Sequence, residues 1–188
     1  MYRVTEIFYS LQGEGFHTGR AAVFVRLAGC NLRCAFCDTD FSHSEPMSAE
    51  QIAERVFAYS TNPDTLIVLT GGEPSLQVDQ ALVEALHRHN QTIAIETNGT
   101  HEIPDGIDWV TVSPKADGTV VLNRADEVKL VFTNQPVTDI QHWLTAIRAS
   151  HYYLQPCSCS NTEEVIAYIL AHPEWRLSLQ TQKYIHIR

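Results

Sequence analysis

The first feature with clear chemical potential is a group of three closely spaced cysteines. Cys30, Cys34 and Cys37 follow a Cys-x3-Cys-x2-Cys spacing, which suits ligation of one compact metal site. Soft thiolate ligands select zinc, copper(I) or iron–sulfur clusters. A cubane iron–sulfur cluster that is fully held by protein takes four cysteines, so three would leave one iron open. An open iron could bind a substrate or a cofactor, and the spacing therefore favours a catalytic metal site.

Two other interpretations of these cysteines stay open on spacing alone. His43 lies close by and could complete a tetrahedral Cys3His zinc site, which would make the chain a non-catalytic zinc-binding module. The cysteines could also be reduced thiols that pack as small apolar residues. The spacing favours a metal site over free thiols, and a cubane cluster over zinc. Cys157 and Cys159 are expected to stay unligated, because the three-cysteine motif is complete without them.

The hydrophobic pattern predicts the scaffold that positions these groups. Strands are expected at residues 4–8, 22–27, 65–69, 92–95, 109–112, 127–132, 152–156 and 177–180. Helices are expected from residue 48, at 78–89, at 138–149 and at 161–172. Ser48 and Gln51 are expected to form a capping box at the first helix, and Thr138 and Gln141 a cap at the third. Asn161 and Glu164 are expected to begin the last helix.

Strands that alternate with helices argue for a mostly parallel sheet with helices outside. A complete eight-fold barrel usually takes about 200 residues or more. The 188 residues therefore favour an α/β fold with an incomplete (β/α) barrel. No linker or low-complexity segment divides the chain, so residues 1–188 are expected to form a single domain.

Several chemically active stretches directly follow predicted strands, where the active sites of (β/α) barrels lie. Arg26 ends an apolar strand, and a buried arginine there must pair with an acid or bind a carboxylate ligand. Thr70-Gly71-Gly72-Glu73-Pro74 follows another strand; its glycines allow close approach of the backbone, and Pro74 suits the first turn of a helix. Glu96 ends a third strand and could bind a cofactor or stabilise its loop.

Together these motifs resemble a known superfamily. The three cysteines, with Phe36 before the last of them, resemble the cluster motif of radical S-adenosylmethionine (SAM) enzymes, and Thr70-Gly71-Gly72-Glu73-Pro74 resembles their second motif. Leu11-Gln12-Gly13-Glu14-Gly15 and Cys37-Asp38-Thr39 are similar to the 7-carboxy-7-deazaguanine synthase family within that superfamily. The matching stretches cover nearly the whole chain, so the resemblance implies an incomplete barrel of the radical SAM type.

The resemblance implies three cofactors, which are a [4Fe–4S] cluster, SAM and Mg²⁺. The three cysteines would ligate the cluster, whose open iron would take the methionine part of SAM. Thr39 would supply a hydroxyl to Mg²⁺. The positions that match SAM contacts of the family are Phe36, Cys37, Asp38, Gly72, Glu96, Ser113, Pro114, Lys115, Gln155 and Pro156.

The implied substrate is 6-carboxy-5,6,7,8-tetrahydropterin, with Arg26 meeting its carboxylate. The matching substrate positions are Leu11, Gln12, Gly13, Arg26, Thr70 and Arg188. The implied reaction is a lyase reaction: hydrogen abstraction at C6, ring contraction and loss of ammonia give 7-carboxy-7-deazaguanine, a precursor of queuosine in tRNA. A glycyl-radical activase shares the cluster motif but must admit a protein loop, and the motifs at residues 11–15 and 37–39 argue against it.

Composition limits the partners. A net charge of −9 without a Lys/Arg-rich run disfavours direct binding to nucleic acid. No apolar run reaches the roughly 18 residues that a membrane span needs, and no signal peptide is visible at the N-terminus. Five cysteines, three of them in one motif, do not fit a secreted disulfide framework. These observations favour a cytoplasmic protein, and the resemblance implies a flavodoxin-like electron donor and a homodimer.

Overall fold

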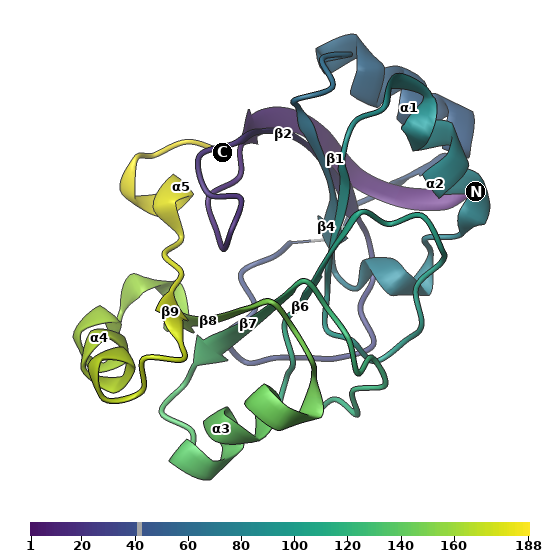
Figure 1. The fold of residues 1–188 in the computed structure, drawn as a ribbon. Helices are drawn as coiled ribbons and strands as arrows, with labels where there is room; N and C mark the ends of the chain where they lie inside the picture. The colour runs from purple at the N-terminus through teal and green to yellow at the C-terminus, as the bar shows by residue number, and fades with distance from the viewer. Residues whose placement is uncertain (41–42) are drawn as a thin grey trace.

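The computed structural model describes residues 1–40 and 43–188, which fold around one curved mixed sheet (Figure 1). The strand order is β3-β1-β2-β4-β5-β6-β7-β8-β9. Neighbours from β2 to β9 run parallel, whereas β1 is antiparallel to both β2 and β3. The strands are β1 (Tyr2–Leu11), β2 (Ala21–Leu27), β3 (Glu45–Met47), β4 (Leu66–Gly71), β5 (Ile93–Thr97), β6 (Trp109–Val112), β7 (Glu127–Phe132), β8 (His151–Pro156) and β9 (Arg176–Leu177).

The sheet curves into an arch but does not close on itself, because β3 and β9 are its two outer strands. The predicted α/β fold with an incomplete (β/α) barrel is therefore confirmed. Helices lie on the convex side: α1 and α2 beside the first strands, and α3 and α4 beside β7 and β8 (Figure 1). These four helices are α1 (Ala49–Tyr59), α2 (Gln80–Leu86), α3 (Val137–Ala146) and α4 (Thr162–Ala171). A fifth helix, α5 (Thr181–Tyr184), lies in the C-terminal segment, and the short 3₁₀ turns are η1 (Pro74–Leu76), η2 (His87–His89) and η3 (Cys157–Cys159). Within the described ranges, no helix is both long and apolar enough to cross a bilayer.

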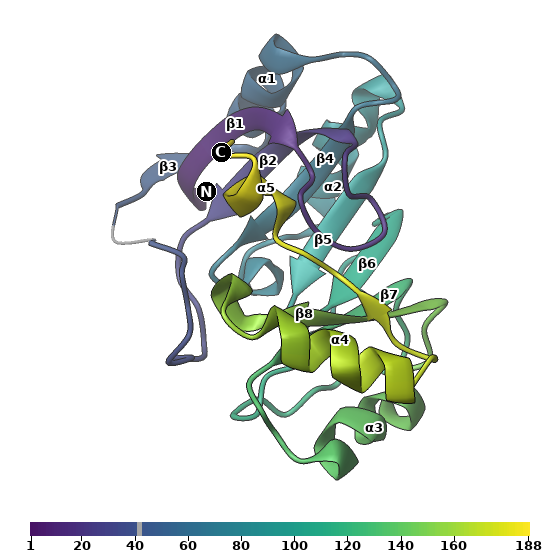
Figure 2. The same ribbon diagram turned by 90° about the vertical axis from the view of Figure 1, so that its left-hand side faces the viewer.

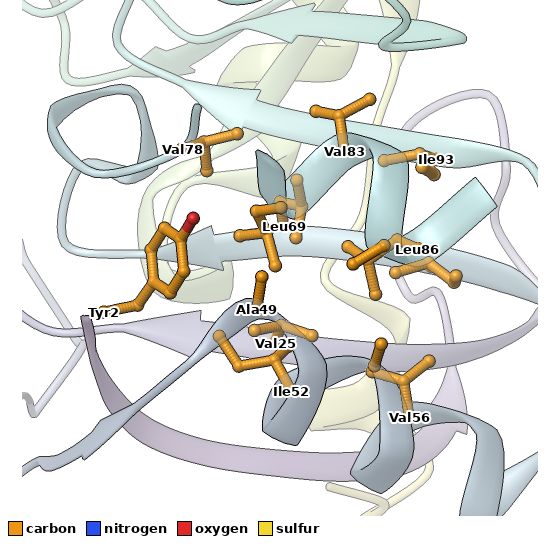
Figure 3. Close-up of a cluster of buried hydrophobic side chains, with 14 of the residues drawn as sticks. Tyr2, Val25, Ala49, Ile52, Val56, Leu69, Val78, Val83, Leu86 and Ile93 are labelled. Carbon is orange, nitrogen blue, oxygen red and sulfur yellow. The ribbon is translucent and has the colours of Figure 1, made fainter. Parts of the chain in front are cut away.

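The main hydrophobic core lies between the convex face of the sheet and the helices α1 and α2 (Figure 3). Ile52 and Val56 of α1 and Leu86 of α2 are fully buried against Val25 and Leu69 of the sheet. The strands β2 and β4 are buried on both faces, which explains their nearly continuous apolar sequences. A second cluster forms the same kind of layer between β7, β8 and the helices α3 and α4.

Alternate residues of the parallel strands point into the concave side of the arch, because successive strand side chains face opposite ways. A small apolar cluster of Ala22, Leu66, Val68 and Ala94 forms the floor on this side. Closer to the carboxyl ends the inward positions become polar. The register places Arg26 beside Thr70 on neighbouring strands and thereby gathers the polar groups of several strands at one end.

The loop between β1 and β2 closes the other end of the arch and turns into its concave side (Figure 1). Phe16 of this loop stacks on Trp109, with ring centroids 4.8 Å apart, and lies 4.5 Å from the His151 ring. The amide of Gly15 donates to Ser178 Oγ at 3.0 Å. This aromatic plug fixes the loop, so the preceding residues of the loop face the interior of the arch.

The C-terminal segment crosses the open side of the arch, from β9 back to β1 (Figures 1 and 2). The amide and hydroxyl of Thr181 both donate to the carbonyl of Gly13, at 3.0 and 2.9 Å. Ser10 donates to the carbonyl oxygen of Arg188 at 2.7 Å. The segment therefore covers the gap that the missing strands of a full barrel would fill.

The predicted strands are all present, although β1 is longer than residues 4–8 and β9 is shorter than residues 177–180. The helix expected at 78–89 is shorter as well and gives way to η2. Ser48 and Gln51 form the predicted capping box of α1. One prediction at a helix start was wrong, because Thr138 does not cap α3, whose N-cap is Pro136. The last helix starts where predicted: Asn161 is the N-cap residue of α4, and its side chain binds Cys157 N and Phe132 O.

Candidate functional site

A cavity of about 610 Å³ opens at the carboxyl ends of the parallel strands. All the predicted site residues line it except Pro114, which is buried behind the wall. The residues brought together are Leu11, Gln12, Gly13, Arg26, Cys30, Cys34, Phe36, Cys37, Asp38, Thr39, Thr70, Gly72, Glu96, Ser113, Lys115, Gln155, Pro156 and Arg188. Segments that lie far apart in sequence thus converge on one chamber.

The three cysteines lie on the loop that follows β2, at the mouth of this cavity. Burial raises the pKa of the Cys34 thiol, while the ammonium of Lys115 lowers it and the thiols of Cys30 and Cys37 raise it further. Such coupling requires the three sulfurs to be near one another. Across residues 1–40 and 43–188, no three His, Cys, Asp or Glu side chains converge on a single ion. The three ligands of a cubane cluster bind three separate irons. Three thiols on one loop of the cavity wall are the donor set that such a cluster needs.

The Gly-Gly-Glu-Pro turn after β4 packs directly against the cysteine loop. The amide of Gly72 donates to Leu27 O at 2.9 Å, and the amide of Glu73 donates to Gly29 O at 2.8 Å. Gly71 has a φ of 126°, in a region that favours glycine. An added Cβ at Gly72 would lie 2.0 Å from Gly29 O, so the contact between the two loops depends on glycine.

Glu73 fixes the turn to the end of β5. Its side chain is 1% exposed and accepts hydrogen bonds from the amides of Ser75 and Asn98, at 3.0 and 2.6 Å, and from the hydroxyl of Thr97 at 2.6 Å. Asn98 in turn donates to Asn31 in the cysteine loop at 3.0 Å. The buried carboxylate thus helps to fix the turn after β4, the end of β5 and the cysteine loop relative to one another. The sequence analysis did not assign this role to Glu73.

Arg26 reaches the cavity from the end of β2 and pairs with Glu6 of β1, with Nε donating to Oε1 at 2.8 Å. Arg188 pairs with the other oxygen of Glu6, and both guanidinium groups lie over the ring of Phe8. Burial lowers the pKa of Arg26, against the opposing effect of Asp38 and Glu14. The guanidinium has five N–H donors, so its pairing with Glu6 leaves capacity for a second carboxylate.

A buried ionic cluster at the base of the cavity was missed by the sequence analysis. Lys129 points inward from β7 and donates to Glu14 and to Glu96, each at 2.7 Å. Gln12 also donates to Glu96, at 3.3 Å. The sequence predicts that Glu96 binds a cofactor or stabilises its own loop, and the structure places it against Lys129. The available signal was a lysine inside the apolar strand sequence of β7, because such a charge must be paired when buried.

Other predicted residues form smaller groups around the chamber. Lys115 is half-buried, and its Nζ donates to the carbonyl of Ser113 at 2.8 Å and to the hydroxyl of Ser113. Asp38 accepts from Lys183 of α5 at 2.6 Å, which joins the cysteine loop to the C-terminal segment. Thr39 lies in the cavity wall and could present a hydroxyl to a metal ion.

Three further residues, His43, Cys157 and Cys159, were considered as additional metal ligands. His43 is exposed and does not line the cavity. Cys157 lines the cavity and Cys159 follows it in the turn η3; both are free thiols. Neither observation supports a fourth protein ligand for a site on the cysteine loop.

The incomplete (β/α) barrel and the three-cysteine loop at the carboxyl ends of its strands are the features expected of a radical SAM enzyme. Residues 24–149 match the family model described as the Radical SAM superfamily. The members of that superfamily use a [4Fe–4S] cluster and SAM, and the residues of the cavity fit both groups.

Comparisons over the full length narrow this class. The chain is 48% identical to the 7-carboxy-7-deazaguanine synthase of Bacteroides thetaiotaomicron over all of both chains. It is 45% identical to that of Bordetella pertussis, over 99% of each chain. The crystal structure of QueE from Escherichia coli superposes with a TM-score of 0.79 at 30% identity, covering 95% of this chain and 93% of that one. The chain belongs to the 7-carboxy-7-deazaguanine synthase family of the radical SAM superfamily.

Proposed function

We propose that this chain converts 6-carboxy-5,6,7,8-tetrahydropterin into 7-carboxy-7-deazaguanine and ammonia. The observation that carries the proposal is one chamber that combines the three-cysteine loop, the Gly-Gly-Glu-Pro turn and Arg26, in a chain 48% identical to a synthase of that name along its whole length. Loss of one NH₃ balances the ring contraction. These full-length relatives support this reaction over both alternatives weighed from the sequence, the glycyl-radical activase and the zinc module.

Cys30, Cys34 and Cys37 would hold the [4Fe–4S] cluster, with Lys115 nearby to offset the negative charge of the thiolates. When bound, the cluster and SAM supply an electron and the adenosyl radical that takes a hydrogen atom from the substrate. Gly72, Glu96 and Ser113 would contact SAM, together with Phe36, Asp38, Pro114, Lys115, Gln155 and Pro156 in the surrounding wall. The surrounding wall would help to keep water from the reacting atoms once the ligands are bound.

Arg26 would bind the substrate carboxylate, and the loop at Leu11, Gln12 and Gly13 would lie against the pterin ring. Thr70 lies beside Arg26 in the strand register, at the same depth of the arch. Arg188 would close this end of the chamber from the C-terminal segment. Thr39 would give its hydroxyl to Mg²⁺, a cation that keeps waters and substrate oxygens among its ligands.

The proposal also includes the domain organisation, compartment, oligomeric state and electron donor that the family resemblance implies. Residues 1–188 would act as a single radical SAM core domain in the cytoplasm, as a homodimer reduced by a flavodoxin-like protein. The product would enter the synthesis of queuosine and related 7-deazapurines of tRNA, while the chain itself binds a small molecule rather than nucleic acid. Light scattering of the reconstituted protein tests the dimer, and a single-copy mass would contradict it.

The reaction is tested by anaerobic reconstitution with iron and sulfide, followed by incubation with SAM, dithionite, Mg²⁺ and the carboxylated pterin. We expect 5′-deoxyadenosine and 7-carboxy-7-deazaguanine by mass spectrometry. Formation of 5′-deoxyadenosine without the deazapurine would support the radical chemistry but contradict the proposed substrate. A colourless protein that contains zinc and forms neither product would contradict the proposal as a whole.

Replacement of Arg26 by alanine should weaken binding of the carboxylated pterin. Loss of one partner of a buried charge pair costs several kcal/mol, so we expect the KM to rise about 100-fold. Iron content should not change, because Arg26 lies on β2 rather than on the cysteine loop. Arg88→Ala, which removes an exposed pair with Glu50, is the matched control and should leave the KM unchanged. An unchanged KM for Arg26→Ala would remove this residue from the substrate site.

A further inference from the structure

The ionic cluster at the base of the cavity includes Lys129 and Glu14, to which the proposed ligand contacts assign no role. It centres on Lys129, whose side chain is 6% exposed and lies in the middle of β7. The two nearest acids come from different parts of the chain: Glu14 from the loop between β1 and β2, and Glu96 from β5. A buried ammonium is costly unless it is paired and hydrogen-bonded, so this arrangement must be specified by the fold.

Glu14 is the more completely bound of the two acids. Its Oε2 accepts from Lys129 at 2.7 Å and from Gln155 at 3.2 Å. Its Oε1 accepts from the side-chain amides of Gln180 and Gln182, at 3.0 and 3.1 Å. One carboxylate thus binds β7, β8 and the C-terminal segment at once.

Lys129 lies 2.7 Å from both acids, but the side-chain amides of Gln180 and Gln182 add their hydrogen bonds to Glu14. Burial alone would raise the pKa of Glu14, but Lys129 and the glutamine amides lower it to about 2. Burial raises the pKa of Glu96, and Lys129 offsets that effect only in part. Both acids together raise the pKa of Lys129 above its ordinary value despite burial. The Lys129–Glu14 pair is therefore charged at every pH at which the protein would work.

The other charged groups that face this pair come from the neighbouring strands. Burial raises the pKa of Glu127, two residues earlier on β7, to about 7. Lys115 interacts with Lys129, Glu96 and Glu14 from the segment after β6. Arg26 interacts with Glu14 from β2. The cluster thus contains three acids and three cations, and removal of the Lys129 ammonium would leave the acids in excess.

The geometry points to Lys129 as a positioning residue that acts through Glu14. Glu14 adjoins Gln12 and Gly13, and Thr181 binds the carbonyl of Gly13 directly. We propose that the Lys129–Glu14 pair holds the loop at residues 12–14 and the C-terminal segment at 180–182 together, and so forms the wall against which the substrate ring lies. This inference rests on the proposed function for its effect on turnover, but the wall itself is present without substrate.

Replacement of Lys129 by methionine keeps most of the side-chain volume and removes the charge. Hydrogen exchange of the protein without substrate should show the Thr181 amide exchanging at least about tenfold faster, because opening of this contact would cost less. In the reconstituted enzyme, the KM for the pterin should rise, and 5′-deoxyadenosine should accumulate in excess over the deazapurine. Lys129→Arg should restore much of both properties. Arg55→Met, which breaks an exposed ion pair with Glu45, is the matched control.

A pH profile separates positioning from general loss of stability. In the wild type, Glu14 stays ionised because its pKa is about 2, so the KM should not vary through Glu14 between pH 6 and 9. Without Lys129, burial would place the pKa of Glu14 above its ordinary value. Glu14 would then be neutral and docked at low pH, and ionised and expelled as pH rises. The KM of Lys129→Met should therefore increase with pH, by up to about tenfold per unit.

The double variant Lys129→Met/Glu14→Gln keeps an oxygen at position 14 for the glutamine amides and removes the titrating group. It should lose most of this pH dependence, and it provides a second variant if Lys129→Met alone does not fold. Unchanged exchange at Thr181 in both variants, or a KM of Lys129→Met that does not vary with pH, would overturn the inference. If the wild type makes no deazapurine, the proposed function fails, while the exchange measurement still decides the role of Lys129.

Discussion

Replacement of Cys34 by alanine is expected to reduce formation of 5′-deoxyadenosine and of the deazapurine to background. Cys34 lies between the other two cysteines in sequence and interacts electrostatically with both of them and with Lys115. Two remaining thiolates cannot hold three irons of a cubane cluster, and alanine supplies no replacement ligand. Iron analysis and absorbance near 400 nm after anaerobic reconstitution measure the loss directly. The fold should persist, since the cysteine loop lies outside all three hydrophobic clusters.

Cys159→Ala is the matched control for this variant. Cys159 is a free, partly exposed thiol in the turn after β8 and does not line the cavity. Its replacement should leave iron content and turnover unchanged. Retention of the full iron content and of deoxyadenosine formation by Cys34→Ala would contradict the assignment of Cys34 as a cluster ligand. Loss of iron in Cys159→Ala would instead indicate that a residue of the turn η3 contributes to the metal site.

The scaffold of the cavity could be predicted because its signals are local. Runs of apolar residues such as 65–69 predict buried parallel strands, and active groups directly after them must meet at the same end of the sheet. The same reasoning predicts that Arg26, Thr70, Glu96 and the cysteine loop share one chamber, and the structure brings them together. The capping box of Ser48 and Gln51 was predicted for the same reason, since both partners lie within one helical turn.

The pairings inside the chamber could not be predicted, because they depend on the register of distant strands. Lys129 and Glu14 are 115 residues apart in sequence, and nothing local links them. Arg26 has Glu6 as its partner only because β1 and β2 are antiparallel in this register. A charge inside an apolar strand shows that a partner exists, but only the packed structure shows which one.

Two short elements were also missed for physical reasons. The strand β3 has three residues, including Pro46, and exists because it pairs with the start of β1. The helix α5 has four residues and no side-chain cap, too few for a periodic signal. Its position is set by contacts with Gly13 and Asp38, on segments far away in sequence. Tertiary contacts, rather than local propensity, determine both elements.

Replacement of Gly72 by alanine should abolish cluster assembly although no ligand is removed. A Cβ at this position would lie 2.0 Å from Gly29 O, 2.5 Å from Gly29 C and 3.1 Å from Cys30 N. These are backbone atoms of the cysteine loop, so they cannot rotate away as a flexible side chain would. The loop would have to move as a unit, together with the hydrogen bond from Glu73 N to Gly29 O. We expect less than about a tenth of the wild-type iron content and a fall in turnover of at least about 100-fold, since an overpacked contact of this kind costs about 1–3 kcal/mol or more.

Gly118→Ala is the matched control, because the crowding there involves side chains. Its Cβ would lie 3.1 Å from Leu32 Cδ1 and 3.1 Å from Thr100 Cγ2, both of which can shift by a few tenths of an ångström. Gly118 also lies next to the cysteine loop, at the side chain of Leu32. The two variants therefore differ in whether the added Cβ meets backbone atoms or side-chain atoms near that loop. Iron content and turnover of Gly118→Ala should stay near wild type. Normal cluster content in Gly72→Ala would show that the two loops can separate without loss of the site, and that the close contact of Gly72 with Gly29 does not position the cysteines.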